Sequence, residues 1–179
     1  NENNVLSEHE DFLKEYIIQK VSPALMTIII SDDLPQDFSN NHAFIAVKLS
    51  FESPIPENKY ALIEIPTELD RFIVLPSIGE KEFVMILDDL IRFHFELIFN
   101  SFEYSAIESH MIKVTRDAEL DMEGDLSNSY INKIVKSVKD RFLAEPVRMV
   151  YDKNIDKDTL EVVKKILRMD KIDSHIPGG

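Results

Sequence analysis

Apolar and polar residues alternate along several stretches of the chain, which predicts β-strands because successive side chains of a strand point to opposite faces. The clearest stretch is 43–51, where four apolar side chains share one face: Ile45, Val47, Leu49 and Phe51. Shorter apolar runs predict further strands at 24–30, 60–65, 71–75, 82–87, 106–115 and 147–151. Pro66 and Pro76 follow two of these runs, and we expect each to end its strand because proline lacks the N–H that a β-ladder needs.

Apolar residues at helical spacing predict four helices, at residues 7–22, 88–100, 118–143 and 158–169. The helix at 118–143 carries a continuous apolar stripe and is expected to be the longest. Asp158 and Glu161 form a predicted capping box at the start of the last helix. Strands come first and helices alternate with strands later, so we expect an α+β fold with a mixed sheet packed with several helices. A length of 179 residues fits a single domain.

The predicted helix at 88–100 is apolar around nearly its whole circumference. Helices of this kind are buried or lie at an interface, and a large uncovered apolar patch usually has a partner. We therefore expect the parent protein to form a symmetric homodimer or a higher homo-oligomer. The expected interface residues are the aromatic side chains of this helix and its exit: Phe93, Phe95, Phe99, Phe102 and Tyr104.

Composition excludes several classes of function. The net charge of −13 argues against a free-standing nucleic-acid binder and against a helix lying on an anionic membrane. The absence of cysteine excludes disulfides, cysteine nucleophiles, thiolate zinc sites and iron–sulfur clusters. None of the four glycines has the spacing of a phosphate loop or a dinucleotide-binding fingerprint. We see no signal peptide, and no apolar run approaches the ~20 residues that span a bilayer.

Acidic residues at every second position from 117 to 125, with Gly124 among them, are the best metal candidate. Counting a calcium loop from Glu119 puts Tyr130 at position twelve, where a bidentate glutamate is required. Acids in the first turns of a helix instead complement its dipole. The five histidines are scattered and form no zinc-binding helix pair: His9, His42, His94, His110 and His175. We therefore expect this chain to hold no metal and no cofactor.

Five ordered strings, at the expected separations, resemble the head or middle domain of the long-chain polyphosphate kinases. They are RFIVLP (71–76), ILDDLIR (86–92), KVTRDAE (113–119), AEPVR (144–148) and DSHIPGG (173–179). The first half matches more loosely, through residues 21–23 and 60–66. The resemblance thus covers essentially the whole chain.

This resemblance implies a parent enzyme that reversibly transfers the terminal phosphate of ATP to polyphosphate, with Mg²⁺ and a phosphohistidine intermediate. The family's catalytic histidines belong to two C-terminal domains, and an N-terminal domain contacts the adenine. Both parts are expected to be absent here, because the chain starts without Met and stops at a Pro-Gly-Gly turn. The resemblance therefore implies a fragment with no catalytic residue, inactive alone, from a cytoplasmic or peripheral inner-membrane kinase. The domain's implied role is dimerisation and shaping of the substrate tunnel.

Arg116 and Arg148 lie inside two of the strings and are our candidates for lining a phosphate channel, because guanidinium binds phosphate in a bidentate fork. The alternative is that each arginine pairs with a nearby acid and only stabilises the fold. The expected partners are Asp117 or Glu119 for Arg116, and Glu145 or Asp152 for Arg148. For the whole chain, the alternative function is an independent acidic α+β module for protein interaction. A natural stop after Gly179 would favour that second function.

Overall fold

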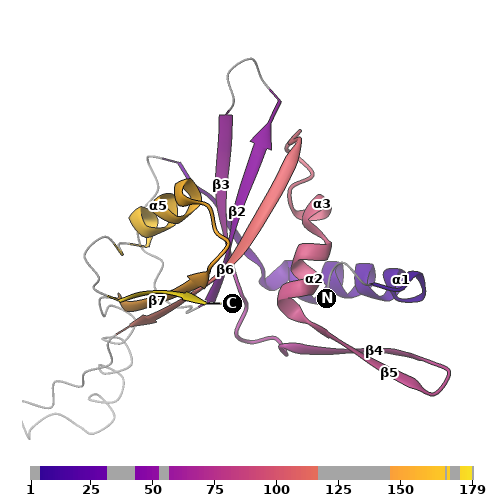
Figure 1. Cartoon of the computed structure of the whole chain (residues 1–179). Helices are drawn as coiled ribbons and strands as arrows, with labels where there is room; N and C mark the ends of the chain where they lie inside the picture. The colour runs from indigo at the N-terminus through magenta and orange to yellow at the C-terminus, as the bar shows by residue number, and fades with distance from the viewer. Residues whose placement is uncertain are drawn as a thin grey trace, which may run out of the picture. The chain divides into compact units, whose positions relative to one another are not determined.

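The computed structural model describes residues 5–31, 43–52, 57–116, 146–167, 169 and 174–178 (Figure 1). The chain forms two compact units. The first unit is Asn1–Ile29 with Ile45–Ser109, and the second is Ile30–Phe44 with His110–Gly179. The long helix predicted at 118–143 lies outside the described residues, as does the acidic run at 117–125.

The strands form a six-stranded sheet in the order β1-β3-β2-β6-β7-β8 and a separate two-stranded hairpin, β4–β5. Their bounds are β1 Met26–Ile29, β2 Ala43–Phe51, β3 Glu57–Glu64, β4 Phe72–Ile78, β5 Lys81–Ile86, β6 Ala106–Arg116, β7 Pro146–Asp152 and β8 His175–Gly178. The β1–β3 and β6–β7 pairs are antiparallel, whereas β7 and β8 are parallel. The expected α+β class with a mixed sheet is therefore confirmed.

Two features of the strands differ from the expectation. Pro76 lies inside β4, and a register shift separates Leu75 from Ile78 in the pairing with β5. A two-stranded hairpin consists of edge strands, where a missing N–H is tolerated, so Pro76 does not end the strand. The short strand β8 was not predicted, because its sequence contains proline and glycine.

The first helix of the first unit buries one side chain per turn. Helix α1 (Ser7–Tyr16) continues into a π-helical turn, η2 (Ile17–Val21), and a 3₁₀ turn, η3 (Ser22–Ala24). The buried side chains are four residues apart: His9, Leu13, Ile17 and Val21. This spacing places them on one helical face, as the apolar periodicity predicts.

The predicted helix at 88–100 is two short helices, α2 (Leu87–Phe93) and α3 (Phe95–Ile98). The break is at His94, whose backbone has φ −111° and ψ 26°, outside the helical region. Burial around this pair of helices agrees with the all-round apolar pattern: Leu87, Leu90, Ile91, Phe95 and Phe99 are all buried.

In the second unit, helix α5 (Lys157–Ile166) lies beside β7 in Figure 1. Ile112, Val114 and Met149 are buried on the strands, and Val163 and Ile166 are buried on α5. No helix in the described parts of the chain has both the length and the apolar composition needed to cross a membrane.

Candidate functional site

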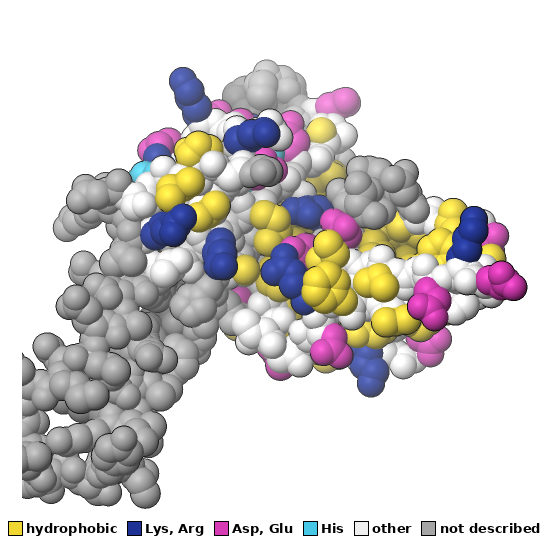
Figure 2. Space-filling view, turned by 60° about the horizontal axis from the view of Figure 1, so that its bottom comes forward, with side chains coloured by type: hydrophobic (Ala, Val, Ile, Leu, Met, Phe, Trp, Pro, Cys, Tyr) yellow, Lys and Arg dark blue, Asp and Glu magenta, His cyan; other side chains and the backbone are white. Residues whose placement is uncertain are grey.

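The β4–β5 hairpin of the first unit has one uncovered apolar face. Phe72, Val74 and Val84 are 63%, 70% and 60% exposed, and Val74 and Val84 are direct cross-strand partners. We call these three residues the hairpin face. The opposite side of the hairpin is buried, because Ile73, Leu75 and Met85 point into the unit. Figure 2 shows hydrophobic side chains open to solvent among charged ones on the side of the molecule that it displays.

Polar contacts from α1 hold the hairpin in place. The buried His9 ring donates from Nε2 to the carbonyl oxygen of Pro76 over 2.9 Å, and its edge meets the Phe83 ring with centroids 4.8 Å apart. At the hairpin turn, Gly79 has φ 62°, a left-handed conformation that favours glycine. The hairpin face is therefore presented by an ordered element.

An ion pair joins the base of the hairpin to α2. Arg71 Nη2 donates to Asp88 Oδ2 over 2.8 Å, and the backbone N–H of Leu87 donates to the Arg71 carbonyl, also over 2.8 Å. The Asp88 side chain is 7% exposed, whereas that of Arg71 is 59% exposed. Asp88 Oδ1 has no hydrogen-bond partner among the described residues. The guanidinium of Arg71 is therefore the group that balances the buried negative charge of Asp88.

The aromatic residues expected at a subunit interface divide into two groups. Phe95 and Phe99 are buried inside the chain, at 8% and 1% exposure, while Phe93, Phe102 and Tyr104 are partly exposed. At the helix break, burial lowers the pKa of His94, and a hydrogen bond from its Nδ1 to the Leu90 carbonyl partly offsets this. Helices α2 and α3 thus belong mainly to the hydrophobic core.

The second unit places the two expected phosphate-lining arginines on neighbouring strands. Arg148 in β7 is exposed and lies opposite Thr115 in β6, and Arg116 follows next in β6, opposite Pro146. The side chain of Arg116 lies outside the described atoms, as do the acids 117, 119 and 145 expected to pair with the two arginines. Among the described residues, none forms an ion pair with Arg148. Its remaining expected partner, Asp152, instead contacts His110.

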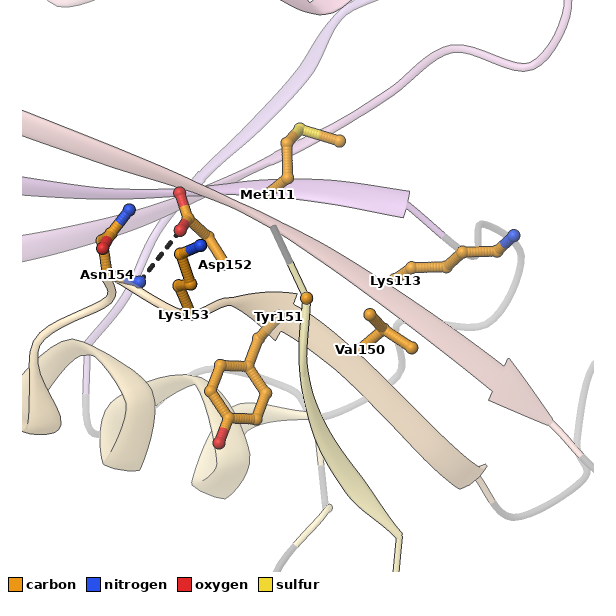
Figure 3. Close-up of a pocket in the computed structure, with 8 residues that line it drawn as sticks. Met111, Lys113, Val150, Tyr151, Asp152, Lys153 and Asn154 are labelled. Carbon is orange, nitrogen blue, oxygen red and sulfur yellow. Dashed lines mark hydrogen bonds between the residues drawn. The ribbon is translucent and has the colours of Figure 1, made fainter.

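Cross-strand partners share a face, so Lys113 and Val150 lie on the same side of the sheet as Thr115 and Arg148. A shallow hollow of about 470 Å³ opens on this side, lined by Met111, Lys113, Val150, Tyr151, Asp152, Lys153, Asn154 and Gly178 (Figure 3). Lys113, Arg148 and Lys153 are exposed, and we call these three residues the basic face. This local excess of cations occurs in a chain whose net charge is −13.

Gly178 of β8 packs closely against β7 where it lines this hollow. A Cβ atom at Gly178 would lie 3.0 Å from Val150 Cγ1, which is closer than an ordinary van der Waals contact. A side chain at this position would therefore require the Val150 side chain to shift.

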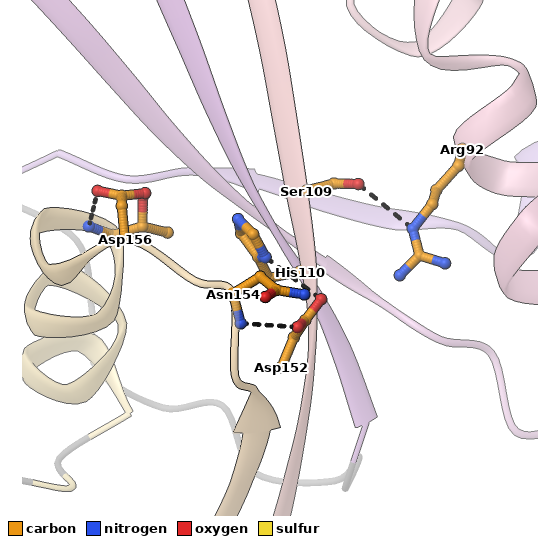
Figure 4. A network of polar contacts seen from close by, with 7 residues as sticks. Arg92, Ser109, His110, Asp152, Asn154 and Asp156 are labelled. Carbon is orange, nitrogen blue, oxygen red and sulfur yellow. Dashed lines mark hydrogen bonds and ion pairs between the residues drawn. The ribbon is translucent and has the colours of Figure 1, made fainter. Parts of the chain in front are cut away.

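His110 of β6 contacts Asp152, the last residue of β7 (Figure 4). Its Nδ1 lies 3.4 Å from Asp152 Oδ2, and the backbone N–H of Asn154 donates to Asp152 Oδ1 over 2.9 Å. Asp156 caps α5 by accepting from the Thr159 N–H over 3.1 Å and the Thr159 hydroxyl over 2.6 Å. The N-terminal cap is thus Asp156 and not the predicted Asp158.

Sequence reasoning missed the hairpin face and the His110 contacts. The hairpin had a visible signal, since 72–75 and 83–87 are apolar on both faces and only one face of a two-stranded hairpin meets the core. His110 and Asp152 are 42 residues apart and form no motif, so no local signal was present.

Comparison with known proteins gives consistent results for sequence and fold. Residues 8–179 match the family model described as the polyphosphate kinase middle domain. The polyphosphate kinase of Vibrio parahaemolyticus is 32% identical over 185 residues, covering 100% of this chain and 26% of that protein. The Escherichia coli K12 polyphosphate kinase is 32% identical over 172 residues, covering 94% of this chain and 24% of that protein.

A solved structure, the polyphosphate kinase from Porphyromonas gingivalis, has a similar fold. The TM-score is 0.72 with 22% sequence identity, over 98% of this chain and 24% of that one. This chain thus spans about a quarter of the length of its relatives. Because the family model covers nearly all of its residues, the chain belongs to the polyphosphate kinase middle-domain family.

Proposed function

We propose that this chain is the non-catalytic middle domain of an ATP:polyphosphate phosphotransferase. The parent enzyme would transfer the terminal phosphate of ATP reversibly to polyphosphate, with Mg²⁺, through residues that lie outside this segment. Family membership over residues 8–179 is the observation that carries the proposal. The lack of a phosphate loop in the sequence supports a non-catalytic role.

The non-catalytic role is tested by comparing the isolated chain with the full-length parent enzyme. The isolated chain, incubated with labelled ATP and Mg²⁺, is expected to give neither labelled protein nor polymer, whereas the full-length enzyme gives both. Stoichiometric labelling of the isolated chain would contradict a non-catalytic role. Full-length protein without polyphosphate synthesis would contradict the assigned reaction.

The hairpin face is proposed to contact a second copy of the parent enzyme in a homodimer. Fully burying a large apolar side chain contributes about 1.5–3 kcal/mol, so Phe72, Val74 and Val84 together supply a substantial driving force. The partly exposed Phe93, Phe102 and Tyr104 offer less, since Phe102 already has the Lys59 ammonium 5.7 Å from its ring centroid. The hairpin therefore replaces the helix as the main proposed contact.

Val74→Lys in the full-length enzyme tests this contact, because the side chain is 70% exposed and its replacement leaves the core intact. We expect sedimentation velocity to show a shift towards monomer with a nearly unchanged melting temperature. Ser77→Lys, an equally charged change at an exposed position of the same strand, is the matched control and should stay dimeric. A Val74→Lys protein that sediments like the wild type would remove the hairpin from the interface.

The basic face, together with Arg116 on the neighbouring strand β6, is proposed to border the path of the polyanion, with Arg148 and Arg116 as the principal contacts. Loss of one charge-assisted hydrogen bond, worth about 1.5 kcal/mol, raises the KM for polyphosphate about ten-fold. Arg148→Ala and Arg116→Ala should each raise this KM without changing the melting temperature. The control Lys20→Ala, at an exposed site in η2, should leave the KM unchanged. A lower melting temperature with intact kinetics would instead assign the arginines to structural ion pairs.

The alternative, an independent interaction module, would also use the hairpin face. It predicts a polypeptide that ends near Gly179 and binds a different protein. The family match across both units favours the kinase domain.

A further inference from the structure

The β4–β5 hairpin carries opposite charges at its two ends. Its turn lies at the end away from α2 (Figure 1). Near this turn Glu82 is exposed on β5, two residues before Val84, and alternate residues of a strand share a face. None of the ion pairs among the described residues includes Glu82. At the opposite end, next to Phe72, the Arg71 side chain is 59% exposed.

The guanidinium of Arg71 retains donors for a second acidic group. Within the described part of the chain, only its Nη2 donates to a side chain, that of the buried Asp88, over 2.8 Å. A guanidinium has five N–H donors in a planar fork, so several remain for another carboxylate. The contact with Asp88 also holds the guanidinium in place, which reduces the conformational entropy that a further contact would cost. Arg71 is therefore a preorganised cation at the base of the hairpin.

The apolar side chains of the hairpin face lie between these two charges. Val74 and Val84 are direct cross-strand partners in the middle, and Phe72 lies nearer the base. An apolar centre with a polar rim is the usual arrangement of a protein–protein interface. In a homodimer with two-fold symmetry, a surface meets the same surface of the second copy, so it has to complement itself.

Charge distinguishes the two ways in which two such faces can stack. A two-fold axis along the strands places base on base, so that Arg71 meets the partner's Arg71 and Glu82 meets the partner's Glu82. Like charges that face each other are unfavourable. An axis across the strands instead places base on turn, so that each Glu82 faces the end of the hairpin that carries the partner's Arg71.

We propose that two copies stack their hairpin faces in antiparallel orientation, with Val74 and Val84 at the two-fold axis and Glu82 of each copy bound to the partner's Arg71. This inference rests on the proposed homodimer and specifies what the hairpin face contacts. Stacked sheets lie about 10 Å apart, a distance that the long side chains of glutamate and arginine span together. Along β5, Val84 then faces the partner's Val84, and Glu82 faces the partner's Ile86 at the base of the hairpin.

Cysteine cross-linking in the full-length enzyme, with any native cysteines replaced, tests this orientation. A short bifunctional thiol reagent is added, and covalent dimers are measured by denaturing electrophoresis. Val74→Cys should cross-link to itself, because a residue at a two-fold axis meets its own copy. Glu82→Cys and Ile86→Cys should each give no dimer alone but should cross-link once the two proteins are mixed and have exchanged subunits. Glu96→Cys, at an exposed position in α3, is the control and should give no dimer.

Charge reversal provides a second measurement that needs no cysteine. Glu82→Lys replaces an attractive contact at each end by two like charges, so we expect the dissociation constant of the dimer to rise about ten-fold, and by less at high salt. Glu96→Lys makes the same change at an exposed position of the same unit and should leave the constant unchanged. Both positions are exposed, so both variants should keep the melting temperature of the wild type.

Two results would overturn the proposal while leaving the hairpin in the interface. The first is a Val74→Lys enzyme that becomes monomeric although Val74→Cys gives no covalent dimer or Glu82→Cys cross-links to itself, which excludes antiparallel stacking. The second is an equal dissociation constant for Glu82→Lys and Glu96→Lys, which excludes the pair with the partner's Arg71. A Val74→Lys enzyme that stays dimeric would contradict the proposed homodimer contact itself.

Discussion

Replacing Arg71 by methionine removes the cation that compensates the buried Asp88 carboxylate while retaining a side chain of similar length. The 2.8 Å contact between the guanidinium and Asp88 Oδ2 is lost, and Oδ1 has no partner among the described residues. A carboxylate that is 7% exposed is then left without a charged partner. Burying an uncompensated charge is unfavourable, so the folded state is destabilised.

The expected loss of stability in Arg71→Met depends on how exposed the side chains of Arg71 and Asp88 are. Breaking a fully buried ion pair costs about 3–5 kcal/mol, but exposed pairs contribute only about 0–1 kcal/mol. Arg71 is 59% exposed and Asp88 is 7% exposed, so an intermediate value applies. We expect Arg71→Met to lower the free energy of unfolding by about 1–2 kcal/mol, and the melting temperature by about 2–8 °C for a chain of this size.

Urea and thermal unfolding of four proteins would measure this effect: the wild type, Arg71→Met, Asp88→Leu and the double variant. The double variant should be more stable than Arg71→Met, because no buried charge remains. Its recovery is partial, since Asp88 also favours the N-terminus of α2. Lys81→Met, an exposed cation in β5, is the matched control and should change stability by less than about 0.5 kcal/mol. An Arg71→Met protein as stable as this control would refute the reasoning.

Three further predictions concern the core, the sheet edge and pH. Phe99→Ala, at a side chain 1% exposed, should cost about 3–5 kcal/mol in denaturant unfolding, whereas a small effect would mean that the aromatic core relaxes freely. Gly178→Ala should speed amide hydrogen exchange in β8, since the new methyl group meets Val150, and unchanged exchange would contradict that clash. Burial lowers the pKa of His94, so its neutral form stabilises the fold above the unfolded pKa of about 6.5, and this stability is lost as the pH falls through the lower folded pKa. His94→Gln should therefore lose less stability than the wild type between pH 7.5 and 5.5, and parallel curves would refute this.

Local patterns predicted most of the elements, because strand and helix periodicity depend on neighbouring residues. The alternation at 43–51 corresponds to β2, Ala43–Phe51. The same periodicity did not show the break at His94, since the apolar positions continue through it while the backbone leaves the helical region. The sequence pattern predicted Asp158 as the cap of the last helix, whereas the contacts of Asp156 with Thr159 show that Asp156 is the cap.

The five strings were enough to assign this chain to its family, and the order of the predicted strands and helices was enough to predict an α+β fold, since both can be read from the residues themselves. Only the tertiary structure shows which apolar faces are exposed to solvent. Phe72 and Ile73 are adjacent apolar residues, yet one is 63% exposed and the other 3%, because only one side of the hairpin meets the core. The pairing of β6 with β7 likewise brings Arg116 close to Arg148 and Asp152 to His110. These contacts depend on residues far apart in the chain, which periodicity and spacing do not encode.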